Sequence, residues 1–306
     1  MSCSRAITCF FVTMVCFNVA CAGATDCIYS VQSDGTELRV EVEPNLAGKS
    51  MKYSAPHHSP DGMRLIFDVT PAKDTDFDNT KLYVLDTAGS SKGEVADLDC
   101  GKSGRWSPDG KRIAFAMYDQ NPKGFQSGIW VMNSDGTDDK WVSDGRWPQW
   151  TPDGKSLITK NYRADGVFLL KVNLETQAIS PFLDDYHPQW QIHWSPDGKR
   201  LLAYLNEADG TKRLVTMNAE GEKNSIIELA DGDIMNLGYS PDGTCVCYTK
   251  RNEDGGNDIF VAPANNKVGT KKLDVFPNAM KEHFCWTSDG KRIVFCARRN
   301  LLTKDE

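Results

Sequence analysis

Three histidines lie four or six residues before an Asp-Gly pair that recurs along the chain. His57 and His193 precede the aspartate of their copy by four residues, and His283 precedes its own by six. Gln149 has the place of His57 in another copy. Imidazole nitrogen and amide oxygen atoms can bind divalent metals. One hypothesis is therefore a divalent metal held by these four side chains. The alternative is that the histidines cap strand starts or bind water, with no cofactor.

Arg105 also precedes its aspartate by four residues, so it has the place of His57 in a further copy. A guanidinium group is a planar fork of donors that suits carboxylates. Arg105 is therefore the candidate catalytic base or carboxylate clamp. No nucleophile elbow, phosphate loop or zinc-protease motif accompanies it. We expect binding without catalysis, and an enzyme is the alternative.

A repeat of 44 to 48 residues must position these side chains. Residues 106–115 read WSPDGKRIAF, in which Pro presets φ, Asp accepts bonds from the following N–H groups and Gly takes a positive φ. Each copy therefore holds a hairpin, and a second Asp-Gly turn joins two further strands. Four short strands in such a period are typical of one blade of a β-propeller. The turn aspartates are Asp61, Asp109, Asp153, Asp197, Asp242 and Asp289.

The first and last copies are complementary halves of one blade. Residues 27–42 align with the third and fourth strands of the repeat, and residues 283–299 align with the first and second. The sequence thus predicts an all-β, six-bladed propeller over residues 25–300. Its last blade combines N-terminal strands C and D with C-terminal strands A and B, which leaves no open sheet edge. Residues 301–306 are expected to be a C-terminal tail.

The same arrangement predicts a binding face. In a propeller, the starts of the inner strands and the loops between the second and third strands lie on one face, around the channel mouth. Aromatic and guanidinium groups there suit an acidic sugar, although propeller loops are rich in such residues in any case. The candidate ligand-binding residues are Trp147, Arg146, Tyr162, Arg163, His187, Arg251 and Arg298.

The phrase Trp/His-Ser-Pro-Asp-Gly-Lys-Arg, with a later Ile-Trp-Val-Met, resembles the PD40 repeat of TolB-type six-bladed propellers. The resemblance covers nearly all of the chain after residue 24 and implies the fold. TolB itself has a separate α/β domain ahead of its propeller, and no room for one precedes the first alignable strands, so a role in the Tol envelope system is not implied. The repeat also occurs in oligogalacturonate lyases, which hold a metal with histidines and a glutamine.

These observations lead to two functional hypotheses. The first is an exported module that binds a protein partner or an oligosaccharide through its channel mouth. The second is a metal-assisted enzyme of the oligogalacturonate-lyase type, in which a metal acidifies the proton beside a uronate carboxylate and Arg105 is the candidate that removes it. The net charge of −7 argues against nucleic acid as a partner. We expect a monomer.

The N-terminal segment predicts export. Arg5, an apolar stretch and the small residues at 22–24 are typical of a signal peptide over residues 1–24. No later stretch is long and apolar enough to span a bilayer. The expected location is periplasmic or extracellular. A lipid anchor at Cys21 is the alternative, because small residues precede that cysteine.

Six cysteines follow residue 24, and an even number in an exported protein fits disulfide bonding. Cys27 opens the N-terminal third strand, and Cys296 lies near the end of the C-terminal strand expected beside it. The sequence therefore suggests a Cys27–Cys296 disulfide that would staple the ring closed. The alternative is a set of buried thiols.

Overall fold

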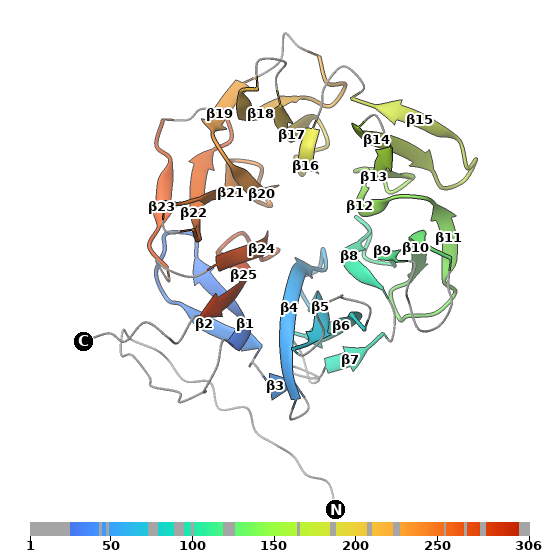
Figure 1. Cartoon of the computed structure of the whole chain (residues 1–306), viewed down its shortest axis with the longest axis horizontal. Coiled ribbons are helices and arrows are strands. Elements are labelled where there is room, and N and C mark those ends of the chain that lie inside the picture. Colours follow the sequence, from blue (N-terminus) through green and yellow to red (C-terminus); the bar gives the residue numbers. More distant parts are fainter. Residues whose placement is uncertain are drawn as a thin grey trace, which may run out of the picture.

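The chain forms a ring of six antiparallel sheets around a central axis (Figure 1). This computed structural model describes residues 25–42, 45–46, 49–72, 79–88, 95–98, 101–118, 126–163, 166–183, 188–206, 210–222, 227–253, 255–265, 268–275 and 280–299. Every regular element in these ranges is a β-strand. The described residues therefore contain no helix that is long and apolar enough to cross a membrane. The predicted six-bladed, all-β propeller is confirmed.

The six sheets are numbered here as blades I to VI in chain order. Blade I is β3 (Asn45–Leu46), β4 (Lys49–His58), β5 (Arg64–Pro71), β6 (Lys81–Asp86) and β7 (Val95–Asp97); blade II is β8 (Lys102–Trp106), β9 (Arg112–Met117), β10 (Gly128–Asn133) and β11 (Lys140–Ser143); blade III is β12 (Arg146–Trp150), β13 (Ser156–Arg163), β14 (Gly166–Asn173) and β15 (Ile179–Phe182). Blade IV is β16 (Pro188–Trp194), β17 (Arg200–Asn206), β18 (Lys212–Asn218) and β19 (Ile227–Asp231); blade V is β20 (Ile234–Tyr239), β21 (Cys245–Arg251), β22 (Asn257–Pro263) and β23 (Lys271–Leu273); blade VI is β24 (Met280–Trp286), β25 (Arg292–Arg299), β1 (Thr25–Gln32) and β2 (Arg39–Val42).

The hairpin between the first two strands of each blade has the chemistry that the sequence predicts. In blade II, the Asp109 carboxylate accepts bonds from the Ser107 hydroxyl at 2.6 Å and from the Lys111 N–H at 3.1 Å. Gly110 has φ +70° and donates its N–H to the Ser107 carbonyl oxygen at 2.9 Å. The hydroxyl–aspartate bond recurs in all six blades at 2.6 to 2.7 Å. The turn therefore fixes the register of every blade.

Blade VI joins the two ends of the chain. β1 pairs antiparallel with β25 over eight residue pairs, from Thr25 opposite Arg299 to Gln32 opposite Arg292. β24 pairs with β25 on the other side, so N-terminal strands complete the last sheet as predicted (Figure 1).

The same register corrects the predicted disulfide. Cys27 lies opposite Ala297, and Cys296 lies opposite Ile28, so the two cysteines are one residue out of step. Neighbouring residues on a strand point to opposite faces of the sheet. Cys27 accordingly packs against blade V, and Cys296 packs against blade I. No disulfide joins them.

The apolar core lies between the blades rather than on the axis. Six buried clusters fill the six interfaces between neighbouring blades. The interface of blades I and II, for example, packs Ile66 and Leu82 against Trp106 and Phe115. Burial of these apolar faces stabilises the ring. The side chains of the inner strands that face the axis are therefore not needed for this core.

Candidate functional site

The inner strand of every blade is irregular near its start. The pairing of the inner strand with the next strand shifts register in all six blades, as a β-bulge does. At these irregularities Ala55, Ser103, Trp147 and His283 have φ between 46° and 56°. A residue other than glycine in this region costs about 1 to 3 kcal/mol and is found most often at functional sites. All four precede their turn aspartate by six residues.

Two of the predicted metal ligands instead connect neighbouring blades. His57 Nδ1 on β4 of blade I accepts the N–H of Trp106 on β8 of blade II at 3.4 Å. His193 Nδ1 on β16 of blade IV lies 3.4 Å from the backbone nitrogen of Tyr239 on β20 of blade V, and 3.0 Å from the Trp194 carbonyl oxygen on its own strand. Both histidines therefore face the backbone of the next blade.

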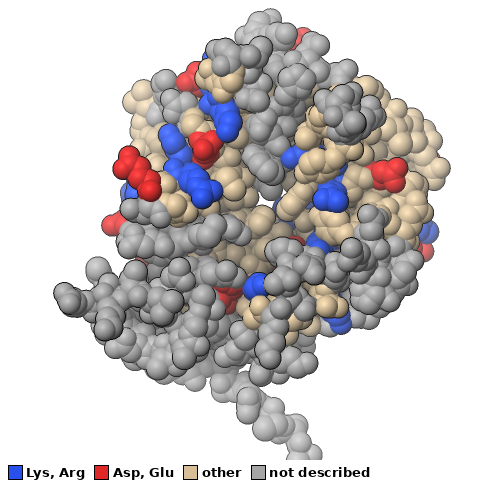
Figure 2. Space-filling model, in the orientation of Figure 1, with Lys and Arg blue, Asp and Glu red and all other residues tan. Residues whose placement is uncertain are grey.

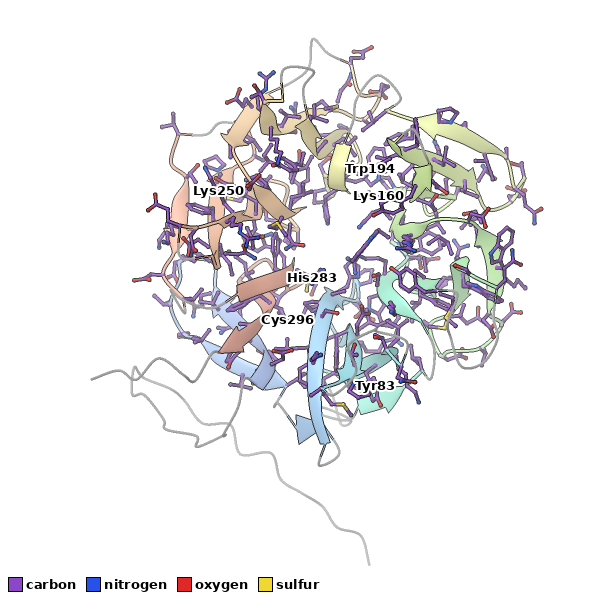
Figure 3. The ribbon with its side chains drawn as sticks, in the orientation of Figure 1. Tyr83, Lys160, Trp194, Lys250, His283 and Cys296 are labelled. Atoms are coloured by element: carbon purple, nitrogen blue, oxygen red, sulfur yellow. The ribbon has the colours of Figure 1, made fainter. Side chains whose placement is uncertain are left out.

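The third histidine, His283, meets a tryptophan from the opposite blade. Its ring stacks on that of Trp147 with the centroids 6.0 Å apart and an angle of 16° between the planes. Inner strands of neighbouring blades contact one another in chain order around the ring, so blades III and VI lie across the axis from each other. Figure 3 shows His283 beside the centre of the ring. The stacked pair thus narrows the channel.

The predicted metal site is not formed by these histidines. Within the described part of the chain, no three His, Cys, Asp or Glu side chains come close enough to hold one ion. His57 and His193 instead place their Nδ1 atoms against the backbone of the next blade. Gln149 lies partly buried on β12.

Arg105 brings a positive charge into the same part of the channel. Burial, with a smaller contribution from the charge of Arg105, lowers the pKa of His193 and of His283 to about 4. The pKa of His57 lies well below its usual value for the same two reasons, in that order. The histidines around Arg105 are therefore neutral at neutral pH.

A second group of charged and aromatic residues lines the mouth at blades II and III. Lys102 Nζ lies 4.5 Å from the ring centroid of Tyr118, and Arg146 Cζ lies 4.7 Å from the same centroid. Arg146 Cζ also lies 5.5 Å from the ring of Tyr162, and Lys160 Nζ lies 5.3 Å from that ring. We call this series, Lys102–Tyr118–Arg146–Tyr162–Lys160, the cation–aromatic ladder.

The ladder lies beside one buried carboxylate. Asp68 on β5 accepts the N–H of Ser103 at 2.8 Å and the hydroxyl of Ser54 at 3.4 Å. Burial raises its pKa to about 7, although Arg105 and Lys102 oppose that rise. Burial also lowers the pKa of Lys160 to about 8. Figure 3 places Lys160 beside the central opening, and Figure 2 shows further basic side chains around it.

The predicted ligand-binding residues fall into three groups. Arg146 and Tyr162 belong to the ladder, and Trp147 lies in the stack. Arg251 is an exposed residue at the end of β21. His187 and the side chains of Arg163 and Arg298 lie outside the described residues, as do residues 1–24 with Cys21, and the 301–306 tail.

Four residues of the site were missed by the sequence analysis: Asp68, Lys102, Tyr118 and Lys160. Asp68 and Lys160 both follow their turn aspartate by seven residues, whereas Tyr118 and Tyr162 follow theirs by nine. The repeat that aligned the inner strands could therefore have found Asp68 and Lys160 on the second strands, and Tyr118 just after one.

The ring of five four-stranded blades and one five-stranded blade, with a narrow polar channel on its axis, defines a six-bladed β-propeller. The sequence profile of the TolB β-propeller domain (PD40) matches residues 36–237, which is more than half of the chain. The chain therefore belongs to the TolB β-propeller family.

Solved structures agree with this fold. A putative TolB from Agrobacterium tumefaciens superposes with a TM-score of 0.68 at 19% identity, over 92% of this chain and all of that one. TolB from Acinetobacter baumannii superposes with a TM-score of 0.62 at 14% identity, over 90% of this chain and 64% of that one. An oligogalacturonate lyase in complex with manganese superposes with a TM-score of 0.55 at 12% identity, over 92% of this chain and 97% of that one. At these identities the likeness shows the fold alone.

One curated relative shares a short segment. The chain is 30% identical over 113 residues to an uncharacterized peptidase, YuxL, of Bacillus subtilis (strain 168). The match spans 34% of this chain and 16% of that protein. The chain thus corresponds to a small part of that relative.

Proposed function

We propose that this propeller is a binding module that holds an acidic oligosaccharide at its channel mouth. The observation that carries the proposal is the cation–aromatic ladder, which sets three basic side chains within 5.5 Å of two tyrosine rings. A cation over an aromatic ring is held by the ring's electron-rich face, so the ladder orders the basic groups in advance of binding.

The charge of the ladder favours a ligand with carboxylates. The whole chain has a net charge of −7, yet Lys102, Arg146 and Lys160 gather at one point of the mouth. Burial raises the pKa of their carboxylate neighbour, Asp68, to about 7, so at neutral pH Asp68 opposes their positive charge less than an ordinary carboxylate does. A local positive field on an acidic protein attracts an anion selectively. Tyr162, whose side chain is 52% exposed, offers part of its ring to a sugar.

A metal-assisted lyase is less well supported by this geometry. That mechanism needs His57, His193 and His283 to converge on one ion, and within the described part of the chain no three such side chains lie close enough together. The binding function needs no such convergence. We accordingly propose binding without catalysis, by an exported, monomeric protein whose residues 1–24 direct it to the periplasm or the exterior and whose Cys21 is not lipidated.

The test is a calorimetric titration of the mature protein with trigalacturonate and with the matching neutral galactose trisaccharide. We expect saturable binding of the acidic trisaccharide that weakens with salt. Arg146→Gln should weaken it about tenfold or more, which corresponds to about 1.4 kcal/mol. Lys140→Gln is the matched control, because Lys140 lies on the outer strand β11 in an exposed pair with Asp138.

Two results would contradict the proposal. Equal binding of the neutral trisaccharide would show that the charge of the ladder is not used. Formation of unsaturated sugar products during the titration, followed by their ultraviolet absorbance, would show that the chain is a lyase.

A further inference from the structure

Asp68 is a buried carboxylate on β5 of blade I that contacts the inner strands of two blades. Its Oδ1 atom accepts the N–H of Ser103 on β8 of blade II at 2.8 Å. Its Oδ2 atom accepts the hydroxyl of Ser54 on β4 of its own blade at 3.4 Å. Asp68 is only 4% exposed. The carboxylate therefore connects blade I directly to the backbone of blade II.

Ser103 lies in the irregular part of β8. The pairing of β8 with β9 shifts register between Lys102 and Arg105, as in a β-bulge. Ser103 has φ 56° and is 2% exposed. A buried backbone N–H at such an irregularity needs an acceptor, because leaving it unpaired is costly. Asp68 supplies that acceptor from the neighbouring blade.

Close packing holds the same bulge against blade I. Gly104 directly follows Ser103, and a Cβ atom there would lie 2.7 Å from Ile66 Cδ1 and 2.9 Å from Leu82 Cδ2. Both distances are shorter than an ordinary carbon–carbon contact. The apolar contact at Gly104 and the hydrogen bond to Asp68 thus fix the position of β8 on blade I together.

The residue before Ser103 is Lys102, the first cation of the ladder. Lys102 Nζ lies 4.5 Å from the ring centroid of Tyr118, and the same ring lies 4.7 Å from Arg146 Cζ. Because Lys102 and Ser103 share a peptide bond, the position of the bulge determines where the lysine side chain begins. Loss of the bond to Asp68 should therefore move Lys102 away from the Tyr118 ring.

The other blades have no acidic residue at the position of Asp68, seven residues after the turn aspartate. The residues there are Ala116, Lys160, Tyr204, Thr249 and Cys296. A neutral side chain could accept the Ser103 N–H without the cost of burying a charge. The carboxylate thus occurs only in the blade that precedes Lys102, which links it to the ladder.

We infer that Asp68 is the positioning residue of the ladder, because through the Ser103 N–H it holds the bulge of β8 that places Lys102 against Tyr118. The inference rests on the proposed function for what the ladder binds, but the position of Lys102 can be measured without a ligand. The charge of ionised Asp68 also opposes the charge of an acidic ligand. Binding and protonation of Asp68 should therefore favour each other.

The charged groups around Asp68 define the pH range of this coupling. Lys102 and Arg105 on β8 lower its pKa, burial raises it to about 7, and burial raises the pKa of Tyr118 to about 12. Asp68 therefore changes charge near neutral pH, whereas Tyr118 does not. Lys160, at the other end of the ladder, has a pKa of about 8 and also gains positive charge as the pH falls. The Asp68→Asn variant separates the two contributions.

The position of Lys102 is tested by nuclear magnetic resonance of the mature protein without a ligand. Overhauser effects between the Lys102 methylene protons and the Tyr118 ring should be present in the unaltered protein. They should persist in Asp68→Asn, whose amide oxygen still accepts the Ser103 N–H, and should fall at least severalfold in Asp68→Leu. The effects at the Tyr162 ring in blade III are the internal control and should not change.

A second buried carboxylate provides the matched control variant. Asp258 is 5% exposed in blade V and forms an ion pair with Lys272 at 2.7 Å. Asp258→Leu should lower the free energy of unfolding but leave the Overhauser effects between Lys102 and Tyr118 unchanged. A loss of these effects in folded Asp258→Leu protein would show that general destabilisation moves Lys102, and would overturn the inference.

Calorimetric titration with trigalacturonate tests the coupling to protons. The unaltered protein should bind severalfold more tightly at about pH 6 than at about pH 8. Asp68→Asn should bind at the higher pH at least as tightly as the unaltered protein and should depend less on pH, since only Lys160 then titrates. Asp68→Leu should bind more weakly at both values. Equal pH dependence of the unaltered and Asp68→Asn proteins would contradict the coupling.

Three results would overturn the positioning role: absence of the Lys102–Tyr118 effects from the unaltered protein, their persistence in folded Asp68→Leu protein, and their loss in folded Asp68→Asn protein. If Asp68→Leu does not fold, the Ser103 amide proton of the unaltered protein decides. Its signal should move as Asp68 ionises around pH 7, together with the Lys102 signals, and a constant signal would overturn the inference. If these signals behave as expected but trigalacturonate does not bind, the proposed function alone is contradicted.

Discussion

The ring of Trp147 on β12 stacks on the ring of His283 on β24, across the channel from it. Both residues have a left-handed backbone, with φ of 56° and 46°. The stack thus joins two strained positions from opposite blades. Because side chains with bulk at Cβ rarely adopt this backbone, the contact compensates a conformation that each residue alone would avoid.

Replacement of Trp147 should distinguish strain from packing. Trp147→Gly and Trp147→Ala both lose the stack, but glycine tolerates positive φ whereas alanine does not. We expect the Gly variant to be more stable than the Ala variant by about 1 kcal/mol, measured by urea unfolding. Trp141, which is 38% exposed on β11 and is not among the residues with positive φ, is the matched control. There the order should reverse, and the same order at both sites would contradict the role of strain.

The same loss of the stack should raise the pKa of His283. Burial is the larger cause of its value of about 4, and the Arg105 charge is the smaller. Trp147→Ala exposes the imidazole to water, so its pKa should move toward the usual 6.5. Titration of the ring by nuclear magnetic resonance measures it. An unchanged pKa would show that other groups bury His283.

Removal of the His57 imidazole should weaken the interface between blades I and II. His57→Leu leaves the Trp106 N–H without its acceptor, which costs about 1 to 3 kcal/mol. His57→Gln supplies an amide oxygen and should lose less. His193→Leu should act similarly at blades IV and V. The two losses should add because the two backbone contacts lie in different interfaces, apart from a small coupling through the charge of Arg105, which acts on both rings. Urea unfolding of the double variant checks this, and a large non-additive energy would contradict separate roles.

Acid should destabilise the fold between about pH 6.5 and pH 4. In that range an unfolded histidine takes up a proton, whereas folded His193 and His283, with pKa values of about 4, do not. Asp68 acts in the opposite sense, since its folded pKa of about 7 lets only the folded state keep a proton there. Its contribution is lost as the pH rises through 7. The histidines outnumber it, so the net stability falls as the pH falls.

Asp68→Asn should make the loss of stability with falling pH steeper. The substitution removes one opposing proton, which changes the slope of unfolding free energy by about 1.4 kcal/mol per pH unit in the middle of the range. Urea midpoints measured from pH 4 to pH 6.5 give both slopes. Equal slopes would show that Asp68 is ionised in the folded protein.

The turn aspartate of each blade should make a moderate contribution to the free energy of unfolding. Asp109→Ala leaves the Ser107 hydroxyl and the Lys111 N–H without their acceptor, with an expected cost of about 1 kcal/mol by thermal unfolding. Asp109→Asn keeps an acceptor oxygen and should cost less. A larger cost for Asn than for Ala would contradict the turn mechanism.

The repeat predicted the scaffold because its chemistry is local. A Pro-Asp-Gly turn such as that around Asp109 needs only adjacent residues, so it can be recognised from the sequence alone. Its hydroxyl–aspartate bond recurs in all six blades. The pairing of β1 with β25 also followed from the aligned half-repeats. The Cys27–Cys296 bridge failed because a register error of a single residue moves a side chain to the other face of a sheet.

The site was harder to predict because it depends on nonlocal geometry. His57 and His193, beside the bulges, face the backbone of the next blade. The positive φ of Trp147 could not be predicted either, because such a backbone is usually found at glycine. Lys160 was missed because the alignment was applied to the first strand of each blade and not to the second. Arg146 and Tyr162 were found because they lie at a strand start and a strand end near the mouth.

The joining of β1 with β25 also determines the order of events during folding. Ile28 meets Cys296 only after almost the whole chain has been made, so the loop-closure entropy of this contact is among the largest in the molecule. Blades I to V can each assemble from neighbouring residues, whereas blade VI must wait for both ends. Until then, one edge of β25 and the blade I cluster around Phe67 lack the partner that β1 supplies, and such uncovered surface promotes aggregation. The channel is therefore complete only when both ends of the chain have met in blade VI.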